Sequence, residues 1–145
     1  MPLYPELISL HDNVFIASNV SFLTHDIAHR MLNKRPGTDR VFSERVGCVE
    51  IMDNVFIGAG TRIMYNVRIG SNVIVAAGSV VTHDLEPNAV YAGVPARRVK
   101  SIEEYMEKLS ANPPYPPELA PRGETVSPEL AEYLWAKFNS ERDKK

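Results

Sequence analysis

Two histidines lie four positions apart in the stretch HDIAHR, where Asp26 follows His25 and His29 comes three residues later. An imidazole can take up and return a proton near neutral pH, because its unperturbed pKa is about 6.5. His25 is therefore a candidate general base. His29 is the rival candidate, and the Asp26 carboxylate could orient either ring. The two histidines also have the spacing of a pair of metal ligands, but no convincing third ligand follows them.

A six-residue repeat in residues 51–86 indicates which elements must position these residues. An Ile or Val opens each hexad: Ile51, Ile57, Ile63, Ile69, Val75 and Val81. The fifth position of each hexad holds Val55, Thr61, Val67, Val73, Ser79 and Leu85. A lone helix repeats every 3.6 residues and a lone strand every two, so neither keeps this period. A hexapeptide repeat predicts a parallel β-helix.

The predicted geometry explains the residue types. Three short strands make one triangular coil, and successive coils are about 4.8 Å apart. The opening residue of each hexad points inward and stacks on its counterpart one coil later. The corners need left-handed backbone conformations, which Gly and Asn adopt most readily. We expect Asn54, Gly60, Asn66, Asn72 and Gly78 at the corners.

The same grid begins upstream, in residues 8–24, where Leu10, Ile16 and Phe22 are six positions apart. It breaks at His25 and resumes near Glu50. The residues between, 25–49, are polar and charged and have no period. A long irregular segment inside a compact domain is uncommon and usually functional. We therefore predict that residues 25–49 form an active-site loop extruded from one corner of the coil.

The C-terminal third follows a different pattern. A helix is predicted over residues 101–110, with Ser101 as its cap, and a second over 127–142, with Ser127 as its cap. The Pro-rich segment between them predicts an extended spacer. The expected organisation is thus a β-helix domain in residues 1–100 and a helical, Pro-rich extension in residues 101–145. The extension would pack on its own domain or a neighbouring subunit, or recruit a partner.

Composition excludes several classes of function. The chain has 145 residues and a formal net charge of −2, and no basic patch dominates, so we expect no nucleic-acid partner. One cysteine, Cys48, allows no internal disulfide and fits a reducing compartment. No apolar run has the length of a membrane span or a signal sequence, so we expect a cytoplasmic protein without a membrane partner.

The hexads, the loop that opens with His25, the segment VVTHDLEPNAV and the segment AGVPARRV together resemble the hexapeptide-repeat acyltransferases. The most similar branch contains sugar O-acetyltransferases of the galactoside, maltose and capsular-polysaccharide types, and xenobiotic acetyltransferases. The resemblance covers roughly residues 8–102. It implies a mostly β protein with a left-handed parallel β-helix, a homotrimer, and active sites between subunits that use acetyl-CoA and no metal.

The resemblance also implies a role for individual residues. It makes His25 the catalytic base, with His29 and Asp26 as possible support. The backbone of Ala59 would approach the thioester, where N–H groups can stabilise an oxyanion. The backbone of Ala77 would meet the pantetheine arm. The remaining positions implied to contact acetyl-CoA are Thr82 and His83 along the arm, and Arg97 and Lys100 at the phosphates.

Three departures from the family pattern affect these expectations. The family usually has VTKD where this chain has VTHD, so His83 replaces a lysine. It usually has Trp where Phe56 stands, so stacking is kept and an indole N–H is lost. Sugar acetyltransferases also carry a further stretch before the first coil, which supplies acceptor-binding residues, whereas here only MPLYPEL precedes it. The chain is thus either a short natural form or a fragment, and its acceptor is poorly determined.

The leading hypothesis is an acetyl-CoA-dependent O-acetyltransferase that acts on a hydroxyl of a sugar or glycan precursor. A xenobiotic O-acetyltransferase that modifies an antibiotic hydroxyl fits the same loop histidine and coil grid. A γ-class carbonic anhydrase shares the β-helix but needs a third histidine ligand and gives AGVPARR no role. A non-catalytic trimeric assembly module is the alternative from a different class. An acetyl-CoA binding and hydrolysis assay would separate that module from the enzymes.

Overall fold

The computed structural model describes residues 2–144. The chain divides into two compact units, one ending at Met106 and one beginning at Glu107. The first unit consists of short strands joined by tight corners. The helical elements of the whole chain are η1 (Pro5–Leu7), α1 (Ala28–Asn33), α2 (Ile102–Ala111), η2 (Pro117–Leu119) and α3 (Pro128–Arg142). The strands are β1 (Ile8–Leu10), β2 (Val14–Ile16), β3 (Ser21–Leu23), β4 (His25–Asp26), β5 (Arg45–Val46), β6 (Val49–Ile51), β7 (Val55–Ile57), β8 (Arg62–Met64), β9 (Val67–Ile69), β10 (Val73–Val75), β11 (Val80–Val81), β12 (Ala89–Ala92) and β13 (Arg97–Ser101).

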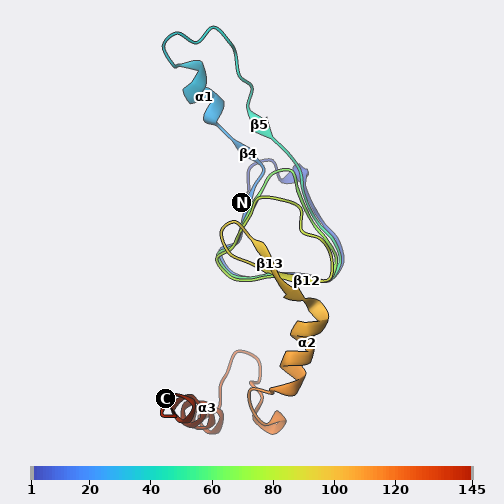
Figure 1. Cartoon of the computed structure of the whole chain (residues 1–145), viewed down its shortest axis with the longest axis vertical. Coiled ribbons are helices and arrows are strands. Elements are labelled where there is room, and N and C mark those ends of the chain that lie inside the picture. The colour runs from blue at the N-terminus through green and yellow to red at the C-terminus, as the bar shows by residue number, and fades with distance from the viewer. Residues whose placement is uncertain (1, 145) are drawn as a thin grey trace. The chain divides into compact units, whose positions relative to one another are not determined.

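The strands form the three faces of a left-handed parallel β-helix, as the hexads predict. One face pairs β1, β6 and β9, the second pairs β2, β7, β10 and β12, and the third pairs β3, β8 and β11, all in parallel. Viewed along its axis, the coils superimpose as a triangle (Figure 1). The antiparallel strand β13 continues the second face beyond β12.

The register confirms the inward stacks. Ile51 lies beside Ile69, Ile57 beside Val75 and Ile63 beside Val81, each pair eighteen positions apart. These side chains are completely buried. In the first coil, by contrast, Leu10 and Ile16 remain 48% and 39% exposed, because within residues 2–144 no further strand pairs with the outer edges of β1 and β2.

Two polar side chains belong to the core and fasten one corner. Thr61 and Ser79 are completely buried, and their hydroxyls both donate to the carbonyl oxygen of Ala76, at 3.3 and 2.7 Å. The Ser79 hydroxyl also accepts from the Gly93 N–H at 3.2 Å. Buried hydroxyls are stable only when they are hydrogen-bonded. These two therefore tie the Ala76 corner to the segment that contains Gly93.

Corner residues adopt the left-handed conformations that the sequence predicts. The positive φ angles include 58° at Asn54 and Asn66, 57° at Asn72, and 72° at Gly60 and Gly78. The asparagine side chains of one corner also bond along the β-helix axis: Asn13 donates to Asn54, Asn54 to Asn72 and Asn72 to Asn88, at 2.7, 3.2 and 2.9 Å. Asparagine thus stabilises these corners in two ways: its backbone adopts the left-handed conformation, and its side-chain amide bonds to the asparagine of the next coil.

The segment between β3 and β6, which carries β4, α1 and β5, leaves the coil at one corner (Figure 1). The predicted loop of residues 25–49 is one residue too long, because Val49 begins β6 and pairs with Ile8. The segment is more regular than the sequence suggests, because β4 and β5 form an antiparallel ladder at its base and α1 lies between them. Two-residue strands and a six-residue helix are too short to produce a detectable period. Paired residues of the later coils are eighteen positions apart in the sequence. Across the insertion this separation rises to forty-one, as in Leu10 beside Ile51.

The helices of the C-terminal third begin where their caps predict. The Ser101 hydroxyl accepts from the Glu104 N–H at 3.1 Å, and the Ser127 hydroxyl accepts from the Leu130 N–H at 3.1 Å. On α3, Leu130 is completely buried, whereas Trp135 is 64% exposed. Among the described residues, no helix is both long enough and apolar enough to cross a membrane.

Candidate active site

His25 lies at the corner that carries the excursion. The strands β3, β8 and β11 lie side by side, and His25, Tyr65 and His83 follow their ends. These three residues therefore mark the same corner in successive coils. The ladder of β4 and β5 places His25 opposite Val46, so the two side chains point to the same side of the ladder.

The His25 imidazole is half-buried and packs edge-on against the Tyr4 ring, with 5.3 Å between ring centroids and 75° between planes. Its Nδ1 atom is buried and has no hydrogen-bond partner within residues 2–144. The Nδ1 atom of His29 is in the same state. Buried polar atoms are nearly always bonded, so these two imidazole nitrogens are open to a partner outside the chain.

Asp26 contacts groups other than the histidines. Its carboxylate accepts a hydrogen bond from the Tyr65 hydroxyl at 2.6 Å and one from the Ala28 N–H at 3.1 Å. The Tyr65 bond is the main reason that the pKa of Asp26 lies below its ordinary value, and the charge of Arg45 adds to the effect. Asp26 thus fastens the base of the excursion to the coil.

Ala59 and Ala77 occupy a second corner, after β7 and β10. The Ala59 carbonyl accepts from the Gly78 N–H at 2.8 Å, so the two coils touch there. Within residues 2–144 the N–H groups of Ala59 and Ala77 form no hydrogen bond. Gly58 permits the contact because it has no Cβ. A Cβ at this position would lie 2.4 Å from the Ala77 nitrogen, too close for the two coils to meet. This corner therefore presents backbone donors on adjacent coils.

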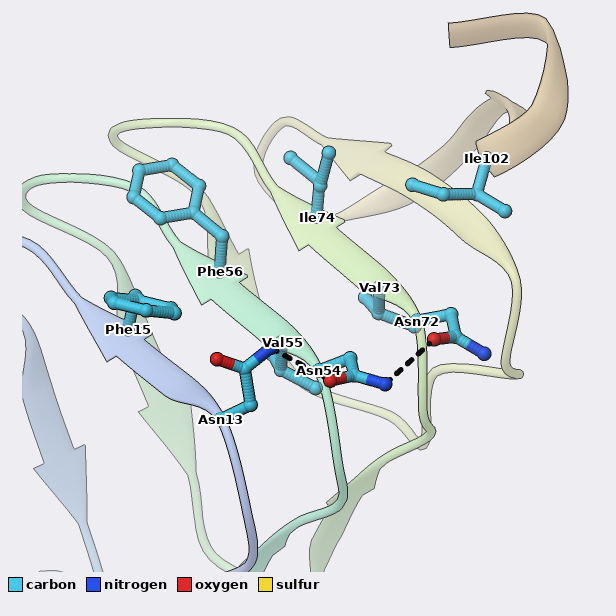
Figure 2. A pocket seen from close by; sticks show the side chains of 9 residues that line it. All are labelled: Asn13, Phe15, Asn54, Val55, Phe56, Asn72, Val73, Ile74 and Ile102. Atoms are coloured by element: carbon cyan, nitrogen blue, oxygen red, sulfur yellow. Dashed lines mark hydrogen bonds between the residues drawn. The ribbon is translucent and has the colours of Figure 1, made fainter. Parts of the chain in front are cut away.

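A shallow apolar groove of about 280 Å³, shown in Figure 2, lies on the second face beside the corner formed by Asn13, Asn54 and Asn72. Phe15, Phe56 and Ile74 project from successive strands on the outer side of the second face. Phe15 and Phe56 are 62% and 44% exposed. The sequence singled out Phe56 only; the register adds Phe15 and Ile74, each the middle residue of its strand.

The remaining predicted residues are on the last coil and on β13. The Thr82 hydroxyl lies 2.7 Å from His83 Nδ1, and both residues are exposed. Arg97 is exposed and Lys100 partly exposed on β13, opposite Ala92 and Val90. The structure brings Thr82 and His83 to the corner of His25, and it brings Ala59 to Ala77.

These two groups lie at different corners of one chain. Ala59 and Tyr65 are six positions apart along the chain, with β8 between them. At the rise of extended chain, the corners are roughly 15–20 Å apart. A single chain therefore does not bring the His25 imidazole to the N–H groups of Ala59 and Ala77. Within residues 2–144, moreover, His, Cys, Asp and Glu side chains form no cluster of three or more suited to a metal ion.

A parallel β-helix of six-residue repeats, with an excursion at one corner, is typical of hexapeptide-repeat proteins. The family profile described as bacterial transferase hexapeptide (six repeats) matches residues 48–83. Protein CapG of Staphylococcus aureus is 37% identical to this chain over 139 residues, which cover 95% of the chain and 74% of CapG. The chain belongs to the hexapeptide-repeat transferase family.

Galactoside O-acetyltransferase of Escherichia coli K12 is 37% identical over 99 residues, which cover 67% of this chain and 45% of that enzyme. A solved galactoside acetyltransferase in complex with coenzyme A superimposes with a TM-score of 0.60 at 30% identity, covering 73% of this chain and 50% of that chain. The chain thus spans about half the length of several curated relatives that it matches.

Proposed function

We propose that this protein is an O-acetyltransferase that transfers acetyl from acetyl-CoA to a hydroxyl of a sugar or glycan precursor. Similarity to a galactoside O-acetyltransferase, and to a related structure that binds coenzyme A, supports the reaction and the donor. The observation that carries the proposal is His25, a half-buried imidazole whose Nδ1 is orphaned at the base of the excursion.

In the proposed reaction, His25 removes the proton of the acceptor hydroxyl as its oxygen attacks the thioester carbonyl carbon. The N–H groups of Ala59 and Ala77 are available to stabilise the negative oxygen and to hold the pantetheine arm. The carbon–sulfur bond then breaks, and His25 returns the proton to the departing thiolate. The ester and coenzyme A are the products, and no metal is required.

Arg97 and Lys100 supply fixed charges for the phosphates of the donor, and Thr82 and His83 supply polar groups along its arm. The groove that contains Phe56 offers apolar surface on the same face as β7 and β10, the strands that precede Ala59 and Ala77. His29, which shares the excursion with His25, is the secondary candidate for the base. Asp26 supports the site by holding the excursion to Tyr65 rather than by contacting an imidazole.

The proposed active unit is a homotrimer with each site between two subunits. The separation of His25 from Ala59 within one chain supports this arrangement, because a neighbouring chain can supply the missing corner. The partly exposed first coil supports it as well, since a short solenoid buries little apolar surface alone.

The substitution His25→Ala tests the base. Acetyl transfer, followed as coenzyme A release with hexopyranoside acceptors, should fall by a factor of about 10²–10⁴. Affinity for acetyl-CoA should be unchanged, because the imidazole faces the acceptor hydroxyl. His29→Ala is the matched control and should cost less. If His29→Ala is inactive and His25→Ala is active, His29 is the base. If both variants keep full activity, neither histidine is the base. If the unmodified protein shows no transfer, the non-catalytic module is favoured.

A mixing experiment tests the site between subunits. Ala59→Pro removes one N–H donor without touching His25. Trimers reassembled from equal amounts of His25→Ala and Ala59→Pro chains should regain about a quarter of the active sites, because some interfaces pair an intact histidine with an intact corner. Sedimentation should give three times the 16.2 kDa chain mass. Trimers that stay inactive after mixing would place both groups in one subunit.

A further inference from the structure

The segment before the first coil reaches His25. The carbonyl oxygen of Leu3 accepts a hydrogen bond from the hydroxyl of Thr24, the residue before His25. Thr24 is 1% exposed, so this bond is protected from water. The Tyr4 carbonyl accepts from the Leu7 N–H at 3.0 Å, which closes a turn. The backbone on both sides of the Tyr4 side chain is therefore fastened.

Tyr4 is held in an unusual conformation. Its φ and ψ are 57° and 59°, the left-handed region that residues other than glycine and asparagine rarely occupy. Such a conformation persists only where the surroundings enforce it, and it is found most often at functional sites. Here it accompanies the edge-on contact of the Tyr4 ring with the His25 imidazole.

The far end of the Tyr4 ring faces Glu44. Its hydroxyl lies 3.4 Å from each carboxylate oxygen of that residue, which is long for an O–H donor. Glu44 precedes β5 and is two residues from Val46, the partner of His25 in the ladder. Tyr4 thus contacts both His25 on β4 and Glu44 just before β5.

His25 needs such a contact, because the usual means of orienting a catalytic imidazole is missing. A general base is normally held by a hydrogen bond to its second ring nitrogen. The Nδ1 atom of His25 has no such partner within residues 2–144. The adjacent carboxylate of Asp26 is bonded to Tyr65 and Ala28 instead. Edge-on packing against Tyr4 is an aromatic contact that can fix the plane of the ring.

We infer that Tyr4 is a positioning residue for His25: its ring, held in place by the left-handed backbone, sets the plane of the imidazole. This inference rests on the proposed function, in which His25 is the base. It assigns a role in the active site to the short segment before the coil, which the sequence alone left without one.

The test compares Tyr4→Ala, which removes the ring, with Tyr4→Phe, which keeps the edge contact and loses the hydroxyl. With acetyl-CoA and hexopyranoside acceptors, Tyr4→Ala should lower kcat about 10–100-fold, as expected for a small misplacement of a catalytic group. The KM for acetyl-CoA should stay unchanged, and Tyr4→Phe should keep most of kcat. Leu3→Ala is the matched control, because it keeps the carbonyl that binds Thr24.

A second readout needs no acceptor. In histidine-labelled protein, NMR coupling constants should show one side-chain rotamer for His25 in the unmodified protein and in Tyr4→Phe, and averaged rotamers in Tyr4→Ala. One rotamer in all three proteins would overturn the inference, and so would a Tyr4→Phe variant as slow as Tyr4→Ala. If Tyr4→Ala is fully active while His25→Ala is inactive, only the role of Tyr4 fails; if His25→Ala is active, the proposed base fails with it.

Discussion

Gly58 allows two coils to meet at the corner that presents the Ala59 and Ala77 N–H groups, so Gly58→Ala is an informative perturbation. The added Cβ would lie 2.4 Å from the Ala77 nitrogen and 2.8 Å from the Ala76 carbonyl carbon. Both are backbone atoms, which cannot rotate away, so the coils must separate locally. Overpacking of this kind typically costs about 1–3 kcal/mol of unfolding free energy. For a domain of this size, that corresponds to a fall in Tm of roughly 2–12 °C.

The same substitution should also impair the site, because the separated coils no longer align the two donors. Gly70→Ala provides the matched control. Its Cβ would lie 2.7 Å from the Pro87 nitrogen and 3.0 Å from the Leu85 carbonyl oxygen, a similar clash at a different corner. Both variants should lose stability, measured by thermal unfolding. Only Gly58→Ala should weaken acetyl-CoA binding, measured by calorimetry at a temperature where both variants are folded.

Two results would refute this reasoning. If Gly58→Ala unfolds at the same temperature as the unmodified protein, the corner is less tightly packed than its distances indicate. If Gly70→Ala weakens acetyl-CoA binding as much as Gly58→Ala does, the loss follows general loosening of the coils and not the alignment of donors. Gly60→Ala separates steric from conformational cost, because nothing lies within 4 Å of its added Cβ but its φ is +72°.

Three further predictions concern separate parts of the chain. Arg97→Ala combined with Lys100→Ala should raise the KM for acetyl-CoA about 10–100-fold with little change in kcat, since contacts to remote phosphates hold ground and transition states alike; a loss of kcat with unchanged cofactor affinity would contradict the assignment. Tyr65→Phe should raise the pKa of Asp26 toward its ordinary value of 3.8, followed by NMR titration. Because the Tyr65 bond lowers the pKa of Asp26 in the folded state, it stabilises the fold above about pH 4, and this stabilisation is lost as the pH falls through the folded pKa. The free energies of unfolding of the two proteins should therefore converge in acid and differ most at neutral pH. Leu130→Ala should destabilise the second unit by about 2–5 kcal/mol, because the side chain is completely buried, and hydrogen exchange should accelerate in α3 and not in the coils.

The local rules of the repeat are readable from residue types, and for that reason the sequence predicted the β-helix well. From residue 51 on, the Ile or Val at the start of each hexad is buried, and Asn54 and Gly60 turn corners, as residue type and spacing predict. The Ser101 and Ser127 caps are equally local, since each hydroxyl bonds an N–H three residues on. His25 begins the interruption of the grid, but it was the resemblance to the acyltransferase family that favoured it over His29 as the base.

What the sequence could not determine depends on residues that are distant along the chain. The contact of Tyr4 with His25 and Glu44, and of Asp26 with Tyr65, joins segments from 21 to 40 positions apart. No periodicity or local propensity encodes such pairs; they arise because the excursion folds back on the coil. The separation of His25 from the Ala59 corner is likewise a property of the closed triangle, since only the assembled faces fix which corners of one chain can meet. The sequence alone thus determined the coil and the candidate base, whereas the tertiary structure decided which side chains surround that base.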